Sequence, residues 1–279
     1  MNIETRRKAE NYIALFLSFL AAVFGLFWLV FILGDVLAHG IGALKPALFL
    51  KDPTPVGVTG GGLRNAFAGQ ALITVFATLI GVPIGVLGGT FLAEYARGRA
   101  IARVISILAD IMVSVPSIVV GTFVYAIMVR PLGHFSGWAG AVALAVIMIP
   151  VVLRTTEDML SLVPWTMREA AFALGAPYYK VIIQIVYRGA ATGILTGIIL
   201  SIARVAGETA PLLFTSFNNA YYSLDMNGPM ASLTVIIFQY AMGPYDDWHV
   251  QAWAASFVIT MAVLALTIIG RLIIKWRYR

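Results

Sequence analysis

Two charged residues interrupt the apolar stretch SIARVAGETAPLLF (201–214). Arg204 and Glu208 are four positions apart, which would place them on one face of a helix. A charged side chain within a membrane is costly, and it usually faces a cavity, an ion partner or a solute path. The pair therefore predicts one of two things. Arg204 could attract an anion while Glu208 moderates that attraction, or the pair could lock a broken helix.

Two further charged residues lie in or next to apolar stretches. Asp110 could pair with Arg154 or Arg204, or cap a helix broken near Pro116. Arg154 could reach toward lipid phosphate, as long basic side chains do near a membrane surface, or it could line an inner pathway. We expect Glu94 to be an interface residue rather than part of a transport site.

Composition restricts the class of protein. The chain has 279 residues, of which 60% are hydrophobic and 11% are charged, and its mean hydropathy is +0.90. Soluble domains carry about 25% charged residues, so we expect an integral membrane protein. Its long uncharged runs favour helices over the short alternating strands of a membrane β-barrel. The absence of cysteine excludes disulfides and thiolate metal sites, and we predict no metal site.

Six apolar stretches are each expected to cross the membrane as a helix. They cover about 12–33, 66–92, 101–129, 138–153, 189–214 and 252–270. The first is too long for the core of a signal peptide, so it is read as a retained anchor. Pro83 should kink the second stretch, and Pro150 should interrupt the fourth. The predicted fold is all-α, a single polytopic transmembrane domain over 1–279.

The distribution of Lys and Arg predicts the orientation. With the N-terminus inside, fourteen lie on the inner side: Arg6, Arg7, Lys8, Arg97, Arg99, Arg103, Arg154, Arg168, Lys180, Arg188, Arg271, Lys275, Arg277 and Arg279. Four lie on the outer side: Lys45, Lys51, Arg64 and Arg130. Cytoplasmic loops are enriched in Lys and Arg. We therefore expect both termini and the polar segment 154–188 in the cytoplasm, and we assign the net charge of +6 to topology rather than to nucleic-acid binding.

The segment 154–188 reads as two short helices. Thr166 and Glu169 have the spacing of a capping box, Gly175 sits where a helix usually stops, and Pro177 suits the first turn of the next helix. The alanines between them leave a slim helix that another protein can approach closely. The segment is therefore expected to dock into a cytoplasmic partner.

The spacing of this segment resembles the EAA loop of ABC importer permeases. That loop has the form E-A-A, three residues, G, nine residues and I-x-L-P. The matching positions are Glu169, Ala170, Ala171, Gly175 and Ile185. Positions 187–188 carry Tyr-Arg instead of Leu-Pro, a difference that bears only on the junction with the next span.

Three other stretches sharpen the resemblance: RVAGETAPLLFT (204–215), FLAEYA (91–96) and ADIMVSVPSIVVG (109–121). With the EAA-like loop, they are similar to the PstA-type permease family of phosphate-specific ABC importers, over about residues 66–275. The resemblance implies the type I ABC importer permease fold, with a core at 66–275 and a coupling loop at 154–188. It also implies a multi-pass protein of the bacterial inner membrane that imports inorganic phosphate.

The same resemblance implies partners and residue roles. The partners are a homologous second permease (PstC type), two copies of an ATPase subunit (PstB type) and a phosphate-binding protein (PstS type). Arg204 and Glu208, with Arg154, would belong to the phosphate path. Asp110 is a further candidate for that path from its position in the third span, not from the resemblance. The residues expected to couple to the ATPase are Glu169, Ala170, Ala171 and Gly175.

Energy is expected to come from a partner. The sequence has no Walker A motif and no zincin, kinase or nucleophile-elbow motif, so we predict a non-catalytic subunit whose ATP and Mg²⁺ are bound by the ATPase. Three alternatives stay open: a permease for phosphonate, sulfate or tungstate; a proton-coupled carrier using Asp110, Arg204 and Glu208; and a structural scaffold. The lack of visible inverted repeats argues against the carrier.

Overall fold

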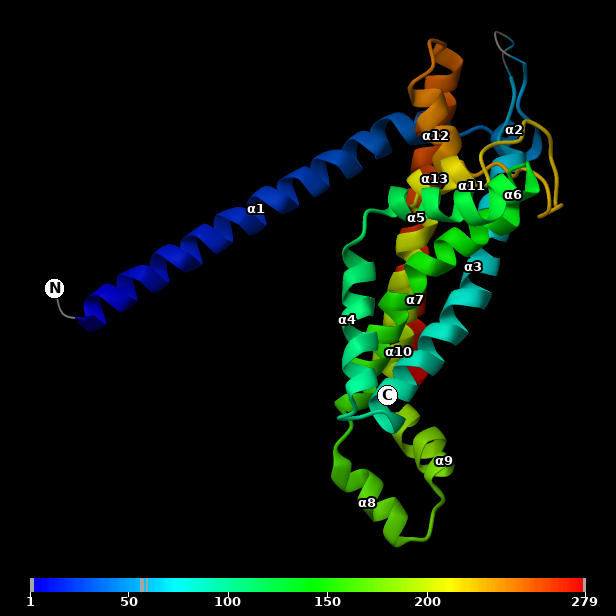
Figure 1. The fold of residues 1–279 in the computed structure, drawn as a ribbon. Coiled ribbons are helices and arrows are strands. Elements are labelled where there is room, and N and C mark those ends of the chain that lie inside the picture. The colour runs from blue at the N-terminus through cyan, green and yellow to red at the C-terminus, as the bar shows by residue number, and fades with distance from the viewer. Residues whose placement is uncertain (1–2, 56–57, 59, 278–279) are drawn as a thin grey trace.

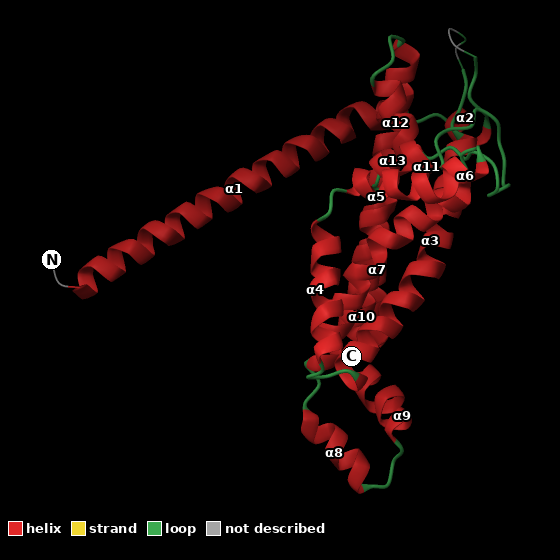
Figure 2. Ribbon diagram, viewed as in Figure 1, coloured by secondary structure: helices red, strands yellow, loops and turns green. Residues whose placement is uncertain are grey.

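The structure is a computed structural model that describes residues 3–55, 58 and 60–277. The described residues form helices joined by loops, as Figure 2 shows. The α-helices are α1 (Ile3–Ala43), α2 (Pro46–Leu50), α3 (Arg64–Thr90), α4 (Ala100–Ser114), α5 (Ser117–Val124), α6 (Arg130–Leu132), α7 (Gly137–Ser161), α8 (Trp165–Ala173), α9 (Tyr178–Val181), α10 (Tyr187–Ala206), α11 (Ala210–Thr215), α12 (Leu233–Ala241) and α13 (Asp246–Arg277). Three π-helical segments continue α3, α5 and α9: η1 (Phe91–Tyr95), η2 (Tyr125–Val129) and η3 (Ile182–Val186).

The core forms around α7, which packs between α3 and α10. Leu144 and Met148 of α7 are fully buried there, together with Ile73 of α3 and Val205 of α10. The backbones of α3 and α7 approach closely, because α3 presents glycines where α7 passes. Without a hydrophobic force between helices in lipid, small residues of this kind allow the close packing that holds membrane helices together.

The third expected span is sharply bent. α4 and the following helical segment 117–132 meet at 102°, across the break at Val115–Pro116. Proline lacks a backbone N–H, and it disfavours a helical conformation at the residue before it, so the helix ends there. The described residues contain five helices long and apolar enough to cross a membrane, or up to six if the bent pair counts as one span.

Two expected boundaries are wrong, and one helix was not expected. The fourth span does not end at 153: α7 runs through Pro150 to Ser161, because the polar-looking extension still buries Thr156 and Leu160. The first span does not end at 33, because α1 continues to Ala43, and the short α2 follows it. Between the fifth and sixth expected spans lies α12, an apolar run too short for a span that packs against α13.

Helix α1 leaves the bundle at an angle (Figure 1). Its C-terminal end touches α13, where the His39 and Trp253 rings stack with centroids 4.8 Å apart. Most of its apolar surface, from Tyr12 to Ile32, is exposed. The first span therefore forms as a helix, but among the described residues it packs against the rest of this chain only at its C-terminal end.

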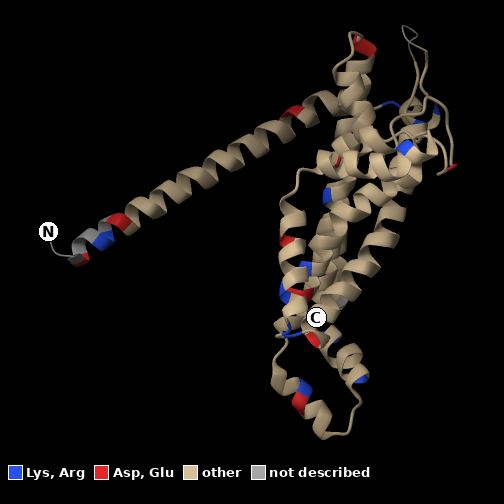
Figure 3. Ribbon diagram, in the orientation of Figure 1, with Lys and Arg blue, Asp and Glu red and all other residues tan. Residues whose placement is uncertain are grey.

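The two ends of the bundle differ. α8 and α9 project together from the end where the described chain terminates, while α2, α6 and the loop after α11 lie at the opposite end (Figure 1). Charged residues gather at the helix ends and around α8, and the long middle parts of the helices carry few (Figure 3). The two candidate sites lie in different elements: Arg204 is in a membrane span, and Glu169 is on the projecting α8.

The α3–α7 contact can be tested at Gly89, where an added Cβ would meet the backbone of Leu153. We expect Gly89→Val to lower the free energy of unfolding by about 1–3 kcal/mol, the usual cost of overpacking, measured by thermal unfolding in detergent. Gly25→Val on α1 is the matched control, since nothing lies within 4 Å of a Cβ there. Equal stability of the two variants would contradict the packing.

Candidate functional site

The span that carries Arg204 is interrupted directly after it. α10 ends at Ala206, Gly207 is its C-terminal cap, and α11 begins at Ala210. Pro211 causes the break, because its ring would clash with the carbonyl four residues earlier, that of Gly207. Glu208 therefore lies outside the helix, and the expectation that it shares a helical face with Arg204 is wrong.

The two charges nevertheless remain neighbours. Arg204 Nε lies 4.0 Å from Glu208 Oε1, at the outer limit of an ion pair, and the Arg204 side chain is 45% exposed against 17% for Glu208. This is the only ion pair of Arg204 among the described residues. Its guanidinium has five N–H donors, so most of its capacity to bind an anion is unused in this chain.

Side chains from two other helices hold the break in place. Gln70 Nε2 of α3 donates to the Ala206 carbonyl at 3.1 Å, and Thr234 Oγ1 of α12 donates to the Glu208 carbonyl at 2.9 Å. Both acceptors have lost the partner that a continuous helix would provide. The buried Gln70 Oε1 has no hydrogen-bond partner among the described residues. The position of Arg204 thus depends on α3 and α12 as well as on α10.

A second charged cluster joins α4 to α7 nearer the α8 end. Arg154 Nε lies 2.8 Å from Asp110 Oδ1, and Arg154 Nη1 lies 2.8 Å from Glu157 Oε2. Ser106 of α4 also donates to Glu157. Of the partners considered for Asp110, the structure selects Arg154. With both carboxylates ionised, the three side chains carry a formal charge of −1, so Arg154 is largely neutralised.

The start of α8 differs from the expectation. Pro164 is its N-cap, and no side chain caps the helix, so the capping box of Thr166 and Glu169 is wrong. Both residues lie inside the first turns, because Pro164 already fixes the backbone before them. The expected stop is confirmed: α8 ends at Ala173, and Gly175 adopts a left-handed φ of 77°.

The surface of α8 is mostly unpartnered. Glu169 and Ala170 are exposed, whereas Ala171 is buried toward α9 and α10. Glu169 has no ion-pair or hydrogen-bond partner among the described residues. The helix also exposes large apolar side chains around the small ones: Trp165, Met167, Phe172 and Leu174. A projecting helix with this much exposed apolar surface is typical of a protein–protein contact.

One buried ion pair at this end was missed from the sequence. The Arg168 and Glu94 side chains are only 2% and 1% exposed and pair with each other, although Glu94 was expected at an interface. The available signal was a lone carboxylate in the apolar stretch FLAEYA, which needs a cationic partner wherever it is buried. The sequence alone did not identify that partner among the inner basic residues.

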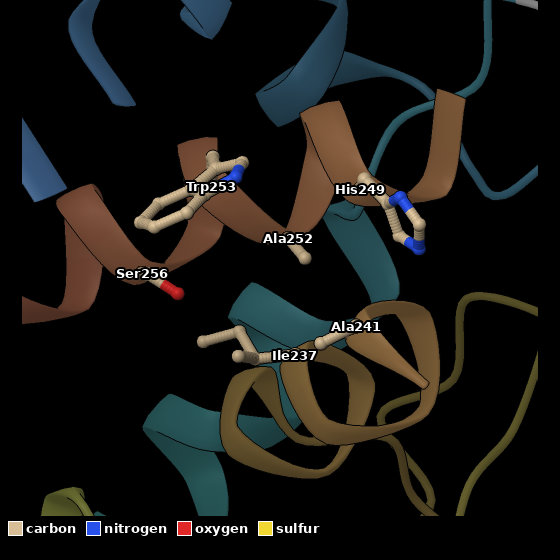
Figure 4. Close-up of a pocket in the computed structure, with 6 residues that line it drawn as sticks. All are labelled: Ile237, Ala241, His249, Ala252, Trp253 and Ser256. Carbon is tan, nitrogen blue, oxygen red and sulfur yellow. The ribbon is translucent and has the colours of Figure 1, made fainter. Parts of the chain in front are cut away.

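A cavity of about 340 Å³ lies between α12 and α13. Figure 4 shows its lining side chains, which are Ile237, Ala241, His249, Ala252, Trp253 and Ser256. His249 Nε2 is within 2.8 Å of the Gly243 carbonyl. The lining contains neither Arg204 nor any other Arg or Lys, so this cavity is separate from the candidate anion site at Arg204. Among the described residues, no group of three His, Asp or Glu side chains is arranged to hold a metal ion.

The chain matches known proteins over most of its length. Residues 81–278 match the family described as "Binding-protein-dependent transport system inner membrane component". The phosphate transport system permease protein PstA of Pasteurella multocida is 53% identical, with 95% of each chain covered. PstA of Yersinia pestis is 50% identical, covering 96% of this chain and 90% of its own. PstA 1 of Mycobacterium tuberculosis strain CDC 1551 is 36% identical, covering 96% and 90%.

A solved structure shares the fold. The structure titled "Inward facing conformations of the MetNI methionine ABC transporter: CY5 native crystal form" aligns with a TM-score of 0.57 at 21% identity, covering 76% of this chain and 94% of that chain. At this identity the likeness concerns the fold alone. It confirms the expected type I ABC importer permease fold.

The support of the α10–α11 break can be tested with Thr234→Val, which removes the donor to the Glu208 carbonyl while keeping the side-chain shape. We expect the free energy of unfolding to fall by about 1–3 kcal/mol, because a buried acceptor loses its partner. Thr260→Val on α13 is the control, since that hydroxyl donates only to Ser256 of its own helix. A loss no greater than in the control would contradict the role of Thr234.

Proposed function

The chain belongs to the binding-protein-dependent transport system inner membrane components and is a permease subunit of an ABC importer of phosphate, and we propose that Arg204 lies on its phosphate path. The supporting observation is that Arg204 lies within a membrane span but is not closely paired with another side chain. Arg204 sits at the end of a membrane-spanning helix, yet its side chain is 45% exposed and only loosely paired. A structural role alone would favour closer pairing, because an unpaired charge in an apolar layer is costly.

The exposed face of α10 points to a second subunit. Leu200, Arg204 and Gly207 are exposed and lie on the same side of the helix end. A guanidinium facing lipid directly would be unfavourable, so this face needs a polar or protein cover. A homologous second permease would supply that cover and leave a path between the two subunits, with Arg204 on its wall.

Glu208 is proposed to limit the affinity for phosphate. A carboxylate 4.0 Å from the guanidinium reduces the positive potential that a bound anion feels. Conduction requires binding that is favourable enough for entry but weak enough for release. The helix break also leaves the backbone beside Arg204 accessible, because Gly207 has no side chain to cover it.

The Arg154 cluster is proposed to lie at the exit. Arg154 is shared between Asp110 and Glu157, so an outgoing anion meets a site with little net attraction. This arrangement favours release toward the end that carries α8. It also ties the bent α4 to α7, so that the two helices move together when the path opens.

Helix α8 is proposed to bind a cytoplasmic ATPase and to transmit the movement of that ATPase to the membrane helices. The sequence has no nucleotide-binding motif of the Walker type, and α8 projects from the bundle with exposed apolar residues and an unpartnered Glu169. The excess of Lys and Arg on this side supports a cytoplasmic position for α8 and for both termini. Two ATPase subunits, one beneath each permease, would bind ATP and Mg²⁺, and a phosphate-binding protein would deliver phosphate at the opposite end.

Transport would then follow alternating access. Closure of the ATPase dimer would draw the two α8 helices together, and each permease would rotate as a nearly rigid body around the path between them. Phosphate would lose part of its hydration shell beside Arg204 and regain water at the exit. Uptake that survives without ATP and collapses with a proton uncoupler would instead favour the carrier mechanism.

The role of Arg204 can be tested with Arg204→Gln. We expect phosphate uptake to fall about 10- to 100-fold, because a charged hydrogen bond to the anion contributes about 1.5–3 kcal/mol. Assembly should be retained, as judged by co-purification with the ATPase. Arg130→Gln on α6 is the control and should transport normally. A variant that disassembles would instead identify a structural ion pair.

The docking surface can be tested with Glu169→Lys. We expect the chain to insert normally but to lose the ATPase during purification, because the reversed charge would face the partner at a desolvated contact. Glu169→Gln keeps the shape of the side chain and should retain more of the ATPase. Normal uptake by Glu169→Lys would show that this face of α8 does not receive the ATPase.

A further inference from the structure

The buried pair of Arg168 and Glu94 links α8 to the end of α3, and this contact is not needed for α8 to dock with a partner. Arg168 belongs to α8, and Glu94 belongs to η1 at the end of α3. The two are far apart in the sequence, and no chain connection joins α8 directly to α3. Both side chains are nonetheless almost completely buried where the projecting helices meet the bundle.

All five N–H donors of Arg168 have acceptors. Nε and Nη2 bind the two carboxylate oxygens of Glu94. The remaining bonds reach the carbonyls of Leu160 and Val163 at 3.0 and 2.6 Å, and that of Pro164 at 3.5 Å. Leu160 is in the last turn of α7 and Val163 directly follows its end, so the guanidinium also occupies the negative end of that helix.

Glu94 is held from a third side by α9. The Tyr178 hydroxyl lies 2.8 Å from the Glu94 carbonyl and 3.3 Å from its Oε2. The Tyr178 ring also stacks on Phe172 of α8, with centroids 5.8 Å apart. The buried Arg168–Glu94 pair and the partly buried Tyr178 thus join the ends of α3 and α7 to α8 and α9.

This contact matters because only short turns connect α8 to its neighbours in the chain. A turn at 162–164 precedes the helix, and Gly175, in a left-handed conformation, follows soon after it. Short turns of this kind allow a helix to pivot, so a push on α8 could be absorbed at its ends. A bidentate Arg–carboxylate pair has fixed geometry, and burial protects it from screening by salt.

We propose that Arg168 and Glu94 are positioning residues that transmit the movement of α8 to α3, in addition to the helices α7 and α10 that the chain connects to it. This inference rests on the proposed coupling of α8 to an ATPase. Tyr178 supports the same contact from α9. Helix α3 carries Gln70, which binds the Ala206 carbonyl beside Arg204, so a displacement of α3 would reach the break that holds the anion site.

The test is the ratio of phosphate transported to ATP hydrolysed, in proteoliposomes that contain the complete complex. The main variant is the double substitution Glu94→Gln and Arg168→Met, which removes both charges and leaves no buried ion unpaired. We expect it to assemble and to hydrolyse ATP at about the wild-type rate, while the ratio falls about tenfold. Arg97→Met is the control, because Arg97, like Arg168, lies over the Trp165 ring, but its side chain is exposed.

A milder variant tests the same inference if the double variant does not assemble. Tyr178→Phe keeps the ring and removes only the hydroxyl that binds Glu94, and we expect the ratio to fall about threefold. A wild-type ratio in an assembled double variant, or in Tyr178→Phe, would overturn the inference, since a purely structural pair would lower the amount of complex without changing its coupling. Loss of ATP-dependent uptake in the wild-type complex would instead overturn the proposed function.

Discussion

Backbone groups left without hydrogen bonds are costly where no water can reach them, and this constraint explains how the chain is organised. A helix that stops within the bundle exposes carbonyls that need new donors. At the α10–α11 break, Gln70 and Thr234 supply them. At the end of α7, Arg168 supplies them. Each donor comes from an element other than the helix it completes, so satisfying the backbone also fixes how neighbouring elements are placed.

Three arginines differ in how deeply they are buried and in how closely they are paired, and each arrangement suits a different role. Arg168 is fully buried with every donor engaged, which suits a rigid junction. Arg154 is half-exposed and shared by two carboxylates, which suits a neutralised site that joins two helices. Arg204 is the most exposed of the three and has a single distant carboxylate, which suits transient binding of a mobile anion. Residue type alone does not separate these roles, whereas burial and partner distance do.

Much of the fold could be predicted from hydropathy, because a membrane span requires about 20 apolar residues whatever its neighbours are. The stop at Gly175 and the placement of Glu169 on a short helix also followed from local chemistry. The α12 helix could not be predicted, since nine apolar residues suit a loop, a strand or a buried helix equally well. The extension of α7 past Arg154 was missed because its polar residues resemble a loop until Thr156 and Leu160 are seen to be buried.

The candidate site was predicted less completely than the fold, because its contacts join residues far apart in the chain. The spacing of Arg204 and Glu208 identified both charges but placed them on one helical face, whereas Glu208 lies beyond the end of α10. Pairing of Asp110 with Arg154 was one of several open possibilities, and only the packing of α4 on α7 selects it. Nothing local to Glu94 or Arg168 indicates that they meet, since their contact depends on where α8 lies relative to the end of α3.

This chain is proposed to move phosphate past Arg204 only when an ATPase moves α8. The most direct measurement compares phosphate uptake by proteoliposomes that hold the chain alone with uptake by those that hold the complete complex, with and without ATP and a proton uncoupler. We expect uptake only by the complete complex, and we expect this uptake to require ATP and to be unaffected by the uncoupler. Uptake by the isolated chain, or uptake abolished by the uncoupler while ATP is still present, would contradict it.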